Sequence, residues 1–267
     1  MLKTEMRDAR STHMDKMEPE ELSRLLVTAQ YEAVKACEDA APAIAKAVEA
    51  ITQAFEGGHR LFYIGAGSSG RLGVLDASEC PPTFGADPEQ VQGIIAGGKE
   101  MMFRASEDAE DHYENGVAAM EEYGVSAGDV VVGISAAGGA SYVIGALEWA
   151  KAHGCVTVGL CCNPGAPILQ LADIPILTDT GSEMLTGSTR MKAGTAQKIV
   201  LNTLTTASMV RTGRVYENMM INLKPTNTKL RQRVIRITAA ILDCDEATAE
   251  KQLEQNDWNI RKAVSKG

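Results

Sequence analysis

The first part of the chain has a helical pattern of apolar residues. From Glu18 to Phe55, apolar residues recur at intervals of three and four, which is the spacing of one helix face. Pro42 lies inside this stretch and predicts a boundary between two helices, because proline interrupts helical hydrogen bonding. Residues 1–17 are polar and of mixed charge. We expect them to form an arm rather than a core element.

The middle of the chain alternates between short apolar runs and amphipathic stretches. Five runs have the length of buried strands: Arg60–Ile64, Val91–Ala96, Asp129–Ile134, Val156–Leu160 and Ile174–Leu177. Four stretches between them have helical patterns: Arg71–Ser78, Met102–Tyr123, Ser141–His153 and Pro167–Ala172. Strands that alternate with helices are typical of parallel βαβ units with right-handed crossovers. The pattern therefore predicts an α/β fold: a doubly wound, five-stranded parallel sheet with helices on both faces.

The remaining apolar pattern is entirely helical. Ala193–Arg211 predicts one long helix, and three small helices are expected beyond Pro225, at Leu230–Ile241, Glu246–Gln255 and Ile260–Val264. This pattern divides the chain into three parts. Residues 1–55 form an arm with helices, residues 56–224 form the sheet domain, and residues 225–267 form a small helical bundle.

Composition narrows the classes of function. The 267 residues include 26 Lys and Arg and 35 Asp and Glu, so the net charge is −9, which argues against nucleic acid and anionic membranes as partners. The start of the chain lacks the apolar core of a signal peptide, and no apolar run reaches the ~18 residues of a membrane span. The six cysteines have no zinc-knuckle spacing. We expect free thiols, no metal and a cytoplasmic location.

A glycine-rich loop follows the first predicted strand. Residues 65–70 read GAGSSG and match the GxGxxG pattern, which is weak evidence alone. The second strand lacks the acidic end expected of a dinucleotide site, and Arg71–Leu72 stand where a phosphate-binding P-loop needs Lys and Ser or Thr. Free N–H groups at a helix start favour an anion, so a monophosphate on Gly67, Ser68, Ser69 and Gly70 fits best. The alternative is a tight turn with serine caps.

Two further loops carry hydroxyl groups. The loop after the third strand offers Ser135, and the segment LTGSTRMKAGT before the long helix offers Ser188 and Thr189. Both loops follow strands or precede helices, where backbone N–H groups are free to bind anions. Each loop is therefore a candidate contact to a phosphate or to sugar hydroxyls. The alternative for the second is a helix-capping loop whose charges face solvent.

Two carboxylates are candidates for acid and base chemistry. Glu79 stands in the segment DASECPP, and Glu110 stands in an acidic cluster after the second strand. Glu79 follows Gly70 by nine residues, which is about 13 Å along a helix. It reaches a small ligand at the glycine loop only if the chain folds back at Pro81 and Pro82, or if it comes from a neighbouring subunit. Two carboxylates at one sugar would form an acid and base pair. The alternative is solvated surface charge.

Several long segments together resemble one known family. GAGSSGRLGVLDASECPPTFG, GIIAGG, EDAED and LTGSTRMKAGTAQK strongly resemble the N-acetylmuramic acid 6-phosphate etherases, which have the sugar isomerase (SIS) fold. The opening TEMRDARSTHMDKM is similar to the start of that family, except that Asn is usual where Asp8 stands. The tail CDEATAEKQLEQNDWNIRKAV resembles the ubiquitin-associated-like helical end of the family. The resemblance covers nearly the whole chain.

The resemblance implies a metal-free enzyme that needs no cofactor. It would convert N-acetylmuramic acid 6-phosphate into N-acetylglucosamine 6-phosphate and D-lactate by elimination followed by hydration. By motif, Glu79 matches the acid of the family, and Glu110 matches its second glutamate, which removes the proton at C2. The phosphate would contact Ser68, Ser69 and Gly70, with Ser135 and the Ser188–Thr189 loop. SIS folds usually pair, so a homodimer is expected.

One segment departs from the family. The family has AASGRTPY after the third strand, whereas this chain has SAAGGASY, so Ala137, Gly139 and Ala140 replace a serine, an arginine and a threonine. Each lost charged hydrogen bond is worth about 1.5–3 kcal/mol, or ten- to a hundredfold in binding. Two alternatives follow: an etherase of altered substrate range, or a non-catalytic sugar-phosphate binder resembling the glucokinase regulatory proteins. A third is an aldose–ketose isomerase.

Overall fold

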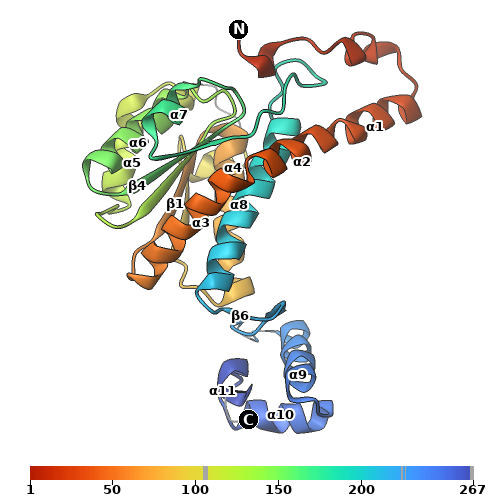
Figure 1. The fold of residues 1–267 in the computed structure, drawn as a ribbon, viewed down its shortest axis with the longest axis vertical. Coiled ribbons are helices and arrows are strands. Elements are labelled where there is room, and N and C mark those ends of the chain that lie inside the picture. Colours follow the sequence, from red (N-terminus) through yellow and green to blue (C-terminus); the bar gives the residue numbers. More distant parts are fainter. Residues whose placement is uncertain (105–107, 224, 226, 265–267) are drawn as a thin grey trace.

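The centre of the molecule is a five-stranded parallel sheet. A computed structural model describes residues 1–104, 108–223, 225 and 227–264 (Figure 1). The sheet order is β2-β1-β3-β4-β5. The strands are β1 (Leu61–Gly65), β2 (Val91–Ile95), β3 (Val130–Ile134), β4 (Val156–Cys161) and β5 (Ile174–Leu177). The five predicted strands and their parallel arrangement are confirmed.

The strand order creates a switch point between β1 and β3. Gly65, the last residue of β1, pairs with Ile95 in β2 and with Ile134 in β3, so these three strands end at the same level. From β1 the chain crosses outward to β2 and then returns to β3 on the other side. Loops that leave adjacent strands in opposite directions leave room for a ligand at this carboxyl edge.

Helices cover both faces of the sheet. One face packs against α3 (Ala41–Glu56), α4 (Gly67–Phe84) and α8 (Lys192–Arg211), and the other against α5 (Tyr113–Glu122), α6 (Ser141–Ala152) and α7 (Pro167–Leu171) (Figure 1). Alternate side chains of β1 contribute to two apolar clusters, one on each face of the sheet. Leu61 and Tyr63 point to the first layer, while Phe62 and Ile64 point to the second. The doubly wound fold is thus built from two apolar clusters on one buried sheet.

The first segment has one helix boundary more than predicted. Three short 3-10 turns, Lys3–Glu5, Ala9–Ser11 and Met14–Lys16, precede α1 (Pro19–Thr28) and α2 (Gln30–Asp39). The boundary near Pro42 is confirmed, because α2 ends at Asp39 and α3 begins at Ala41. Proline is well tolerated there, since the first N–H groups of a helix have no partner in it.

Helix α4 continues through Pro81 and Pro82, so the predicted helix Arg71–Ser78 is too short and the expectation that the chain breaks at these prolines is wrong. It runs from Gly67 to Phe84 and ends at Gly85, which has a left-handed backbone with φ 58°. Proline removes a helical hydrogen bond, so tertiary contacts are needed to keep this last turn. The side chains of Arg214 and Asn222 supply them by donating hydrogen bonds to the carbonyl oxygen of Phe84, at 3.3 and 2.8 Å.

The predicted helix over residues 102–123 is shorter than expected. Two 3-10 turns, η4 (Lys99–Met102) and η5 (Asp108–Glu110), follow β2, and α5 begins only at Tyr113. Residues 105–107, which the prediction included, lie outside the described residues. The described residues between β2 and α5 therefore form short turns and loop at the carboxyl edge of the sheet.

The last part of the chain forms a separate cluster of helices. A short hairpin, β6 (Val215–Tyr216) and β7 (Met219–Met220), was not predicted and leads to α9 (Thr228–Leu242), α10 (Glu246–Glu254) and α11 (Ile260–Val264). These three helices share a small apolar core of their own and lie at the end of the molecule remote from α1 (Figure 1). The three-part division of the chain stays a prediction. No helix among the described residues is long and apolar enough to cross a membrane.

Candidate functional site

The glycine-rich segment forms the first turn of α4 rather than a loop before it. Gly67 has φ 51°, a left-handed conformation that favours glycine. At Gly70 an added Cβ would lie 2.6 Å from the carbonyl oxygen of Gly65. Glycine therefore allows α4 to begin immediately after β1 and to pack closely against it. Gly67, Ser68, Ser69 and Gly70 therefore lie at the switch point, and their contact with a phosphate stays a prediction.

The start of α4 is open to an anion. Ala66 precedes the helix and provides no capping side chain, so the first N–H groups of α4 have no helical partner. The helix dipole adds positive potential at the same place. Ser68 is half-buried beside these groups. The first turn of α4 thus presents backbone and hydroxyl donors at the carboxyl edge of the sheet.

Ser69 is engaged within the protein. Its hydroxyl donates to the Oε1 atom of Gln197 at 3.0 Å, which links α4 to α8. Gln197 is 1% exposed, and its Nε2 atom has no hydrogen-bond partner among the described residues. Sequence analysis did not single out Gln197. The signal was present, because Gln197 stands on the apolar face of α8, four residues after Ala193 and three before Val200.

Ser135 organises the loop after β3. Its hydroxyl oxygen accepts a hydrogen bond from the N–H of Gly138 at 3.0 Å, which leaves its own proton available to another acceptor. Asn163, two residues after the end of β4, donates to the carbonyl of Ala136 at 2.9 Å and to the hydroxyl of Thr4 at 3.0 Å. The N-terminal arm is therefore attached to the loops after β3 and β4. Sequence analysis missed Asn163, whose signal was a polar residue immediately after a buried run.

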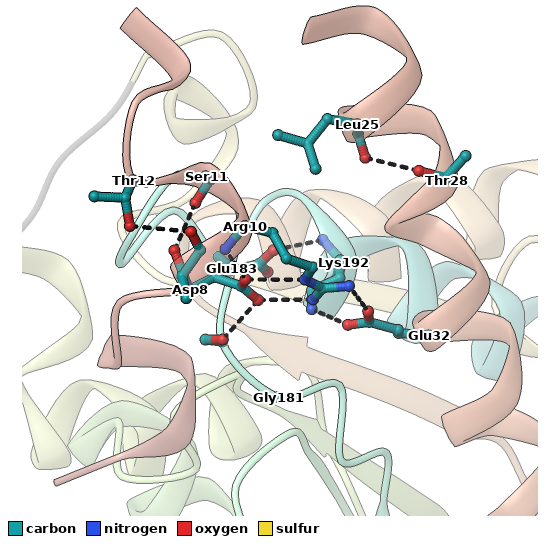
Figure 2. A network of polar contacts seen from close by, with 12 residues as sticks. Asp8, Arg10, Ser11, Thr12, Leu25, Thr28, Glu32, Gly181, Glu183 and Lys192 are labelled. Atoms are coloured by element: carbon teal, nitrogen blue, oxygen red, sulfur yellow. Dashed lines mark hydrogen bonds and ion pairs between the residues drawn. The ribbon is translucent and has the colours of Figure 1, made fainter. Parts of the chain in front are cut away.

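The loop that carries Ser188 and Thr189 is held by an internal carboxylate. Glu183 is completely buried and accepts hydrogen bonds from the backbone N–H groups of Lys192 and Ala193, both at 3.0 Å (Figure 2). The start of α8 is therefore capped by the protein itself, unlike the start of α4. Ser188 and Thr189 are half-buried immediately before this capped end.

A chain of ion pairs ties the arm to the same loop (Figure 2). The ammonium of the buried Lys192 lies 2.5 Å from Glu32 on α2, and Arg10 pairs with both Glu32 and Asp8. Ser182 donates a hydrogen bond to Asp8 at 3.1 Å. The hydrogen bonds from Arg10 are the main cause that lowers the pKa of Asp8 and of Glu32 below their usual values. Asp8, which departs from the family pattern, is thus part of this network.

The two candidate carboxylates lie in different places. Glu110 ends η5, which contacts α6 at the carboxyl edge, and the residue is exposed. Desolvation of its carboxyl group and then the charge of Asp111 raise the pKa of Glu110 above its usual value. Glu79 is exposed on α4, twelve residues after Gly67, which is about 18 Å along a helix. The chain does not fold back before Glu79, so one subunit does not bring it to the first turn of α4.

The altered loop after β3 has space for the missing groups. An added Cβ at Gly139 would have no neighbour within 4 Å, and Gly139 is exposed. Ala137 and Ala140 are half-buried. The lost arginine is therefore not explained by steric exclusion. Among the described residues, no three His, Cys, Asp or Glu side chains lie together in a way that could hold a metal ion.

Comparison with known structures supports the fold. Residues 43–151 match the family model described as the glucokinase regulatory protein N-terminal SIS domain, and residues 106–207 match the SIS domain model. A protein of E. coli CFT073, solved as a complex, is 17% identical and aligns with a TM-score of 0.53 over 73% of this chain and 94% of that chain. The sugar isomerase domain of the RpiR transcription factor from Sphaerobacter thermophilus is 19% identical, with a TM-score of 0.53 over 72% and 91%.

Curated relatives are much more similar in sequence. The N-acetylmuramic acid 6-phosphate etherase 2 of Vibrio cholerae is 48% identical over 98% of this chain and 86% of the relative. The N-acetylmuramic acid 6-phosphate etherase of Salinibacter ruber is also 48% identical, over 98% and 85%. That of Vibrio atlanticus is 52% identical over 84% and 73%. The similarity extends from the N-terminal arm to the C-terminal helices.

Proposed function

Because the chain belongs to the N-acetylmuramic acid 6-phosphate etherases, we propose that it cleaves the lactyl ether of N-acetylmuramic acid 6-phosphate. The products are N-acetylglucosamine 6-phosphate and D-lactate, and the enzyme is a carbon–oxygen lyase. The observation that carries the proposal is 48% identity over 98% of the chain with curated etherases. Both candidate glutamates stand inside that alignment length, in the motifs that resemble the family. The cytoplasmic location stays a prediction.

Two carboxyl groups are sufficient for this chemistry. In the open-chain sugar the aldehyde at C1 acidifies the proton at C2, and Glu110 as carboxylate removes it. The electron pair forms the C2–C3 double bond, the C3–oxygen bond breaks, and Glu79 as acid protonates the departing oxygen of lactate. Water then adds at C3 while a proton returns to C2. The raised pKa of Glu110 supports its role as the base, because a stronger base removes a carbon-bound proton more readily.

The phosphate group is assigned to the switch point. The first turn of α4 offers the N–H groups of Gly67, Ser68 and Ser69 and the hydroxyl of Ser68, and no side chain caps this helix start. The N–H of Gly70 already donates to the carbonyl oxygen of Ala66 at 3.2 Å. The free proton of Ser135 faces the same edge of the sheet from the neighbouring strand. The Ser188–Thr189 segment, held by Glu183, completes the candidate contacts. An uncapped helix start is a general solution for binding phosphate.

Glu79 requires a second subunit. On α4, the residues Ser68, Leu72, Leu75 and Glu79 share one face by helical spacing, and Leu75 is 49% exposed. A neighbouring apolar groove of about 550 Å³ lies between α2, α3 and α8, lined by residues that include Val34, Ile44, Val48 and Ala207. The proposed enzyme is a homodimer in which this side of the molecule meets a second copy. Glu79 of the partner subunit then completes the site that contains Glu110.

A second candidate function rests on one specific observation. Residues 43–151 match the model of a glucokinase regulatory protein domain. Together with the groups lost at Ala137, Gly139 and Ala140, this match favours a protein that binds a sugar phosphate without converting it. The two functions can be distinguished because only the etherase releases D-lactate.

The deciding experiment is release of D-lactate from N-acetylmuramic acid 6-phosphate by the purified protein, with EDTA and no added metal. We expect lactate and N-acetylglucosamine 6-phosphate in equal amounts. Saturable binding of the sugar phosphate without lactate release would instead favour the regulatory function or an etherase of altered substrate. Conversion of an aldose phosphate to a ketose phosphate would favour the isomerase.

A further inference from the structure

A positively charged cavity lies beside the first turn of α4. It has a volume of about 450 Å³ and is bordered by α4 and by the start of α8. Ser68 and Arg71 line it from α4, and Arg190, Thr195 and Lys198 line it from the other side. The cavity therefore adjoins the turn to which the phosphate is assigned, but extends from it along the outer side of both helices.

The charge of this cavity is opposite to that of the whole protein. Three of its lining residues are cationic and none is acidic, in a chain with 35 acidic and 26 basic residues. Arg71 is held in place, because it donates to the carbonyl oxygens of Met102 and Arg104 at 3.2 and 2.8 Å. The side chains of Arg190 and Lys198 make no hydrogen bond or ion pair with another described residue, and the charge of Lys198 interacts with the carboxyl group of Asp76 without an ion pair. Two cations are thus available to an external anion.

The hydrogen bond between Ser69 and Gln197 shows which parts of α4 and α8 lie side by side at the cavity. It joins the first turn of α4 to the second turn of α8, so Lys198 lies level with the first turn of α4. Arg190 precedes α8 by two residues and therefore lies beyond the start of α4. Thr195, between the two cations in sequence, is fixed by a 2.7 Å hydrogen bond to Gln30. Arg190 and Lys198 therefore border the cavity from α8 and the residues before it, which the contact with Gln30 holds in place.

We propose that this cavity binds the carboxylate of the substrate's lactyl group, with Arg190 as its principal partner. The inference rests on the proposed function, whose substrate carries two anions, a phosphate and a carboxylate. The neutral donors of the switch point serve the phosphate. The planar fork of a guanidinium matches a carboxylate with two parallel hydrogen bonds. Lys198 supplies a second positive charge on the same cavity.

The apolar lining fits the rest of the lactyl group. Leu72 and Ile199 border the same cavity as the cations. They provide a surface for the single methyl group of lactate, while Arg190 and Lys198 neutralise its carboxylate. Binding both features would distinguish the lactyl sugar from the same sugar with a free hydroxyl at C3. Arg190 is therefore a specificity-determining residue of the etherase site.

The test compares two ligands that differ only in the lactyl group. Binding of N-acetylmuramic acid 6-phosphate and of N-acetylglucosamine 6-phosphate is measured by calorimetry in the Glu110→Gln protein, which prevents turnover. Arg190→Ala and Lys198→Ala are added to it singly, with Arg190→Lys as the conservative variant. The matched control is Lys46→Ala, an exposed lysine on α3 away from the cavity.

We expect Arg190→Ala to raise the Kd of the lactyl ligand about ten- to a hundredfold, the usual effect of losing a charged hydrogen bond. The Kd of N-acetylglucosamine 6-phosphate should change less than about twofold, as should both values in the control. Arg190→Lys should recover part of the loss, and Lys198→Ala should weaken the lactyl ligand selectively.

Two results would overturn the inference while leaving the proposed function intact. Equal weakening of both ligands would mean that the cations bind the phosphate, and unchanged binding of both would mean that the cavity is not used. If the unaltered protein releases no lactate and the Glu110→Gln protein binds neither ligand, the proposed function itself is wrong and the inference fails with it.

Discussion

The ammonium group of Lys192 lies 2.5 Å from the carboxylate of Glu32, although Lys192 is completely buried and the two residues are 160 positions apart. Through this contact α2 is fixed to the start of α8. The same carboxylate pairs with Arg10, which extends the connection to the N-terminal arm (Figure 2). The loop that carries Ser188, Thr189 and Arg190 is therefore braced by residues from the first 32 positions of the chain.

Removing the charge of Glu32 should destabilise the protein. Glu32→Gln leaves the buried ammonium of Lys192 without its counter-charge, which we expect to cost about 3 kcal/mol of unfolding free energy. Urea unfolding measures this value. The matched control is Glu38→Gln, which removes an exposed partner of Lys35 and should cost less than about 0.5 kcal/mol. Equal, small losses in both variants would show that the Lys192 pair contributes no more than a surface pair.

The same contact predicts how stability depends on pH. The hydrogen bond from Arg10 lowers the pKa of Glu32 below its unfolded value of 4.5. A carboxyl group with a lowered folded pKa stabilises the protein fully above the unfolded pKa, and this contribution is lost as pH falls through the folded pKa. The stability difference between the unaltered protein and Glu32→Gln should therefore shrink below pH 4.5. Urea titrations from neutral to acidic pH test this, and a difference that does not vary with pH would contradict it.

The close approach of β1 and α4 should not tolerate a side chain. In Gly70→Ala the new Cβ would lie 2.6 Å from the oxygen of Gly65 and 2.7 Å from a side-chain carbon of Ile95. Such overpacking costs about 1–3 kcal/mol and would displace the first turn of α4. Thermal unfolding should show the loss for Gly70→Ala but not for Gly139→Ala, where the added carbon has no neighbour within 4 Å. Similar melting temperatures for both variants would argue against the packing explanation.

The two glutamates should separate into different steps of the reaction. Glu110→Gln should suppress both lactate release and exchange of the C2 proton in deuterated water, because the base is lost. Glu79→Gln should block lactate release and leave C2 exchange detectable, because only the acid is lost. A general acid or base is worth roughly a hundred- to ten-thousandfold in rate. Near-normal lactate release by both variants would reject this assignment of the acid and the base.

A shared site should be visible in mixed dimers. If Glu79 acts in the site of the partner subunit, a dimer of one Glu79→Gln and one Glu110→Gln chain retains one intact site. After unfolding and refolding the two inactive proteins together, we expect about a quarter of the normal activity, because half of the dimers are mixed. Refolding each variant alone is the control. No recovery in the mixture would place both glutamates in one subunit.

Much of the architecture could be predicted from local patterns. The run Asp129–Ile134 is apolar at nearly every position after Asp129, which is typical of a strand buried on both faces. The glycines at 65 and 70 follow from the close contact of β1 with α4, and Gly67 follows from its left-handed backbone, both of which are short-range requirements. Because strands that end together place their loops together, Ser68 and Ser135 could be assigned to one edge before their contacts were known.

Other features depend on contacts between remote segments. The end of α4 was predicted wrongly. Pro81 and Pro82 locally favour the end of a helix, whereas Arg214 and Asn222 stabilise the last turn from more than a hundred positions away. The sequence did not reveal the roles of Gln197 and Glu183, because the role of a polar residue within an apolar stretch can be assigned only when its hydrogen-bond partner is known. No spacing rule relates Lys192 to Glu32 or Asn163 to Thr4.

The amino-acid sequence by itself determined the class of fold, the candidate loops for a ligand and the family of the protein, because these depend on periodicity, glycine positions and long motifs. Only the tertiary structure decided which polar groups are already engaged and which remain available. Ser69 is engaged with Gln197, and Glu183 caps α8. By contrast, no side chain caps the start of α4, and the side chains of Arg190 and Lys198 make no hydrogen bond or ion pair within the described part of the chain. The physical reason is that hydrogen bonds and ion pairs are satisfied in space, not along the sequence.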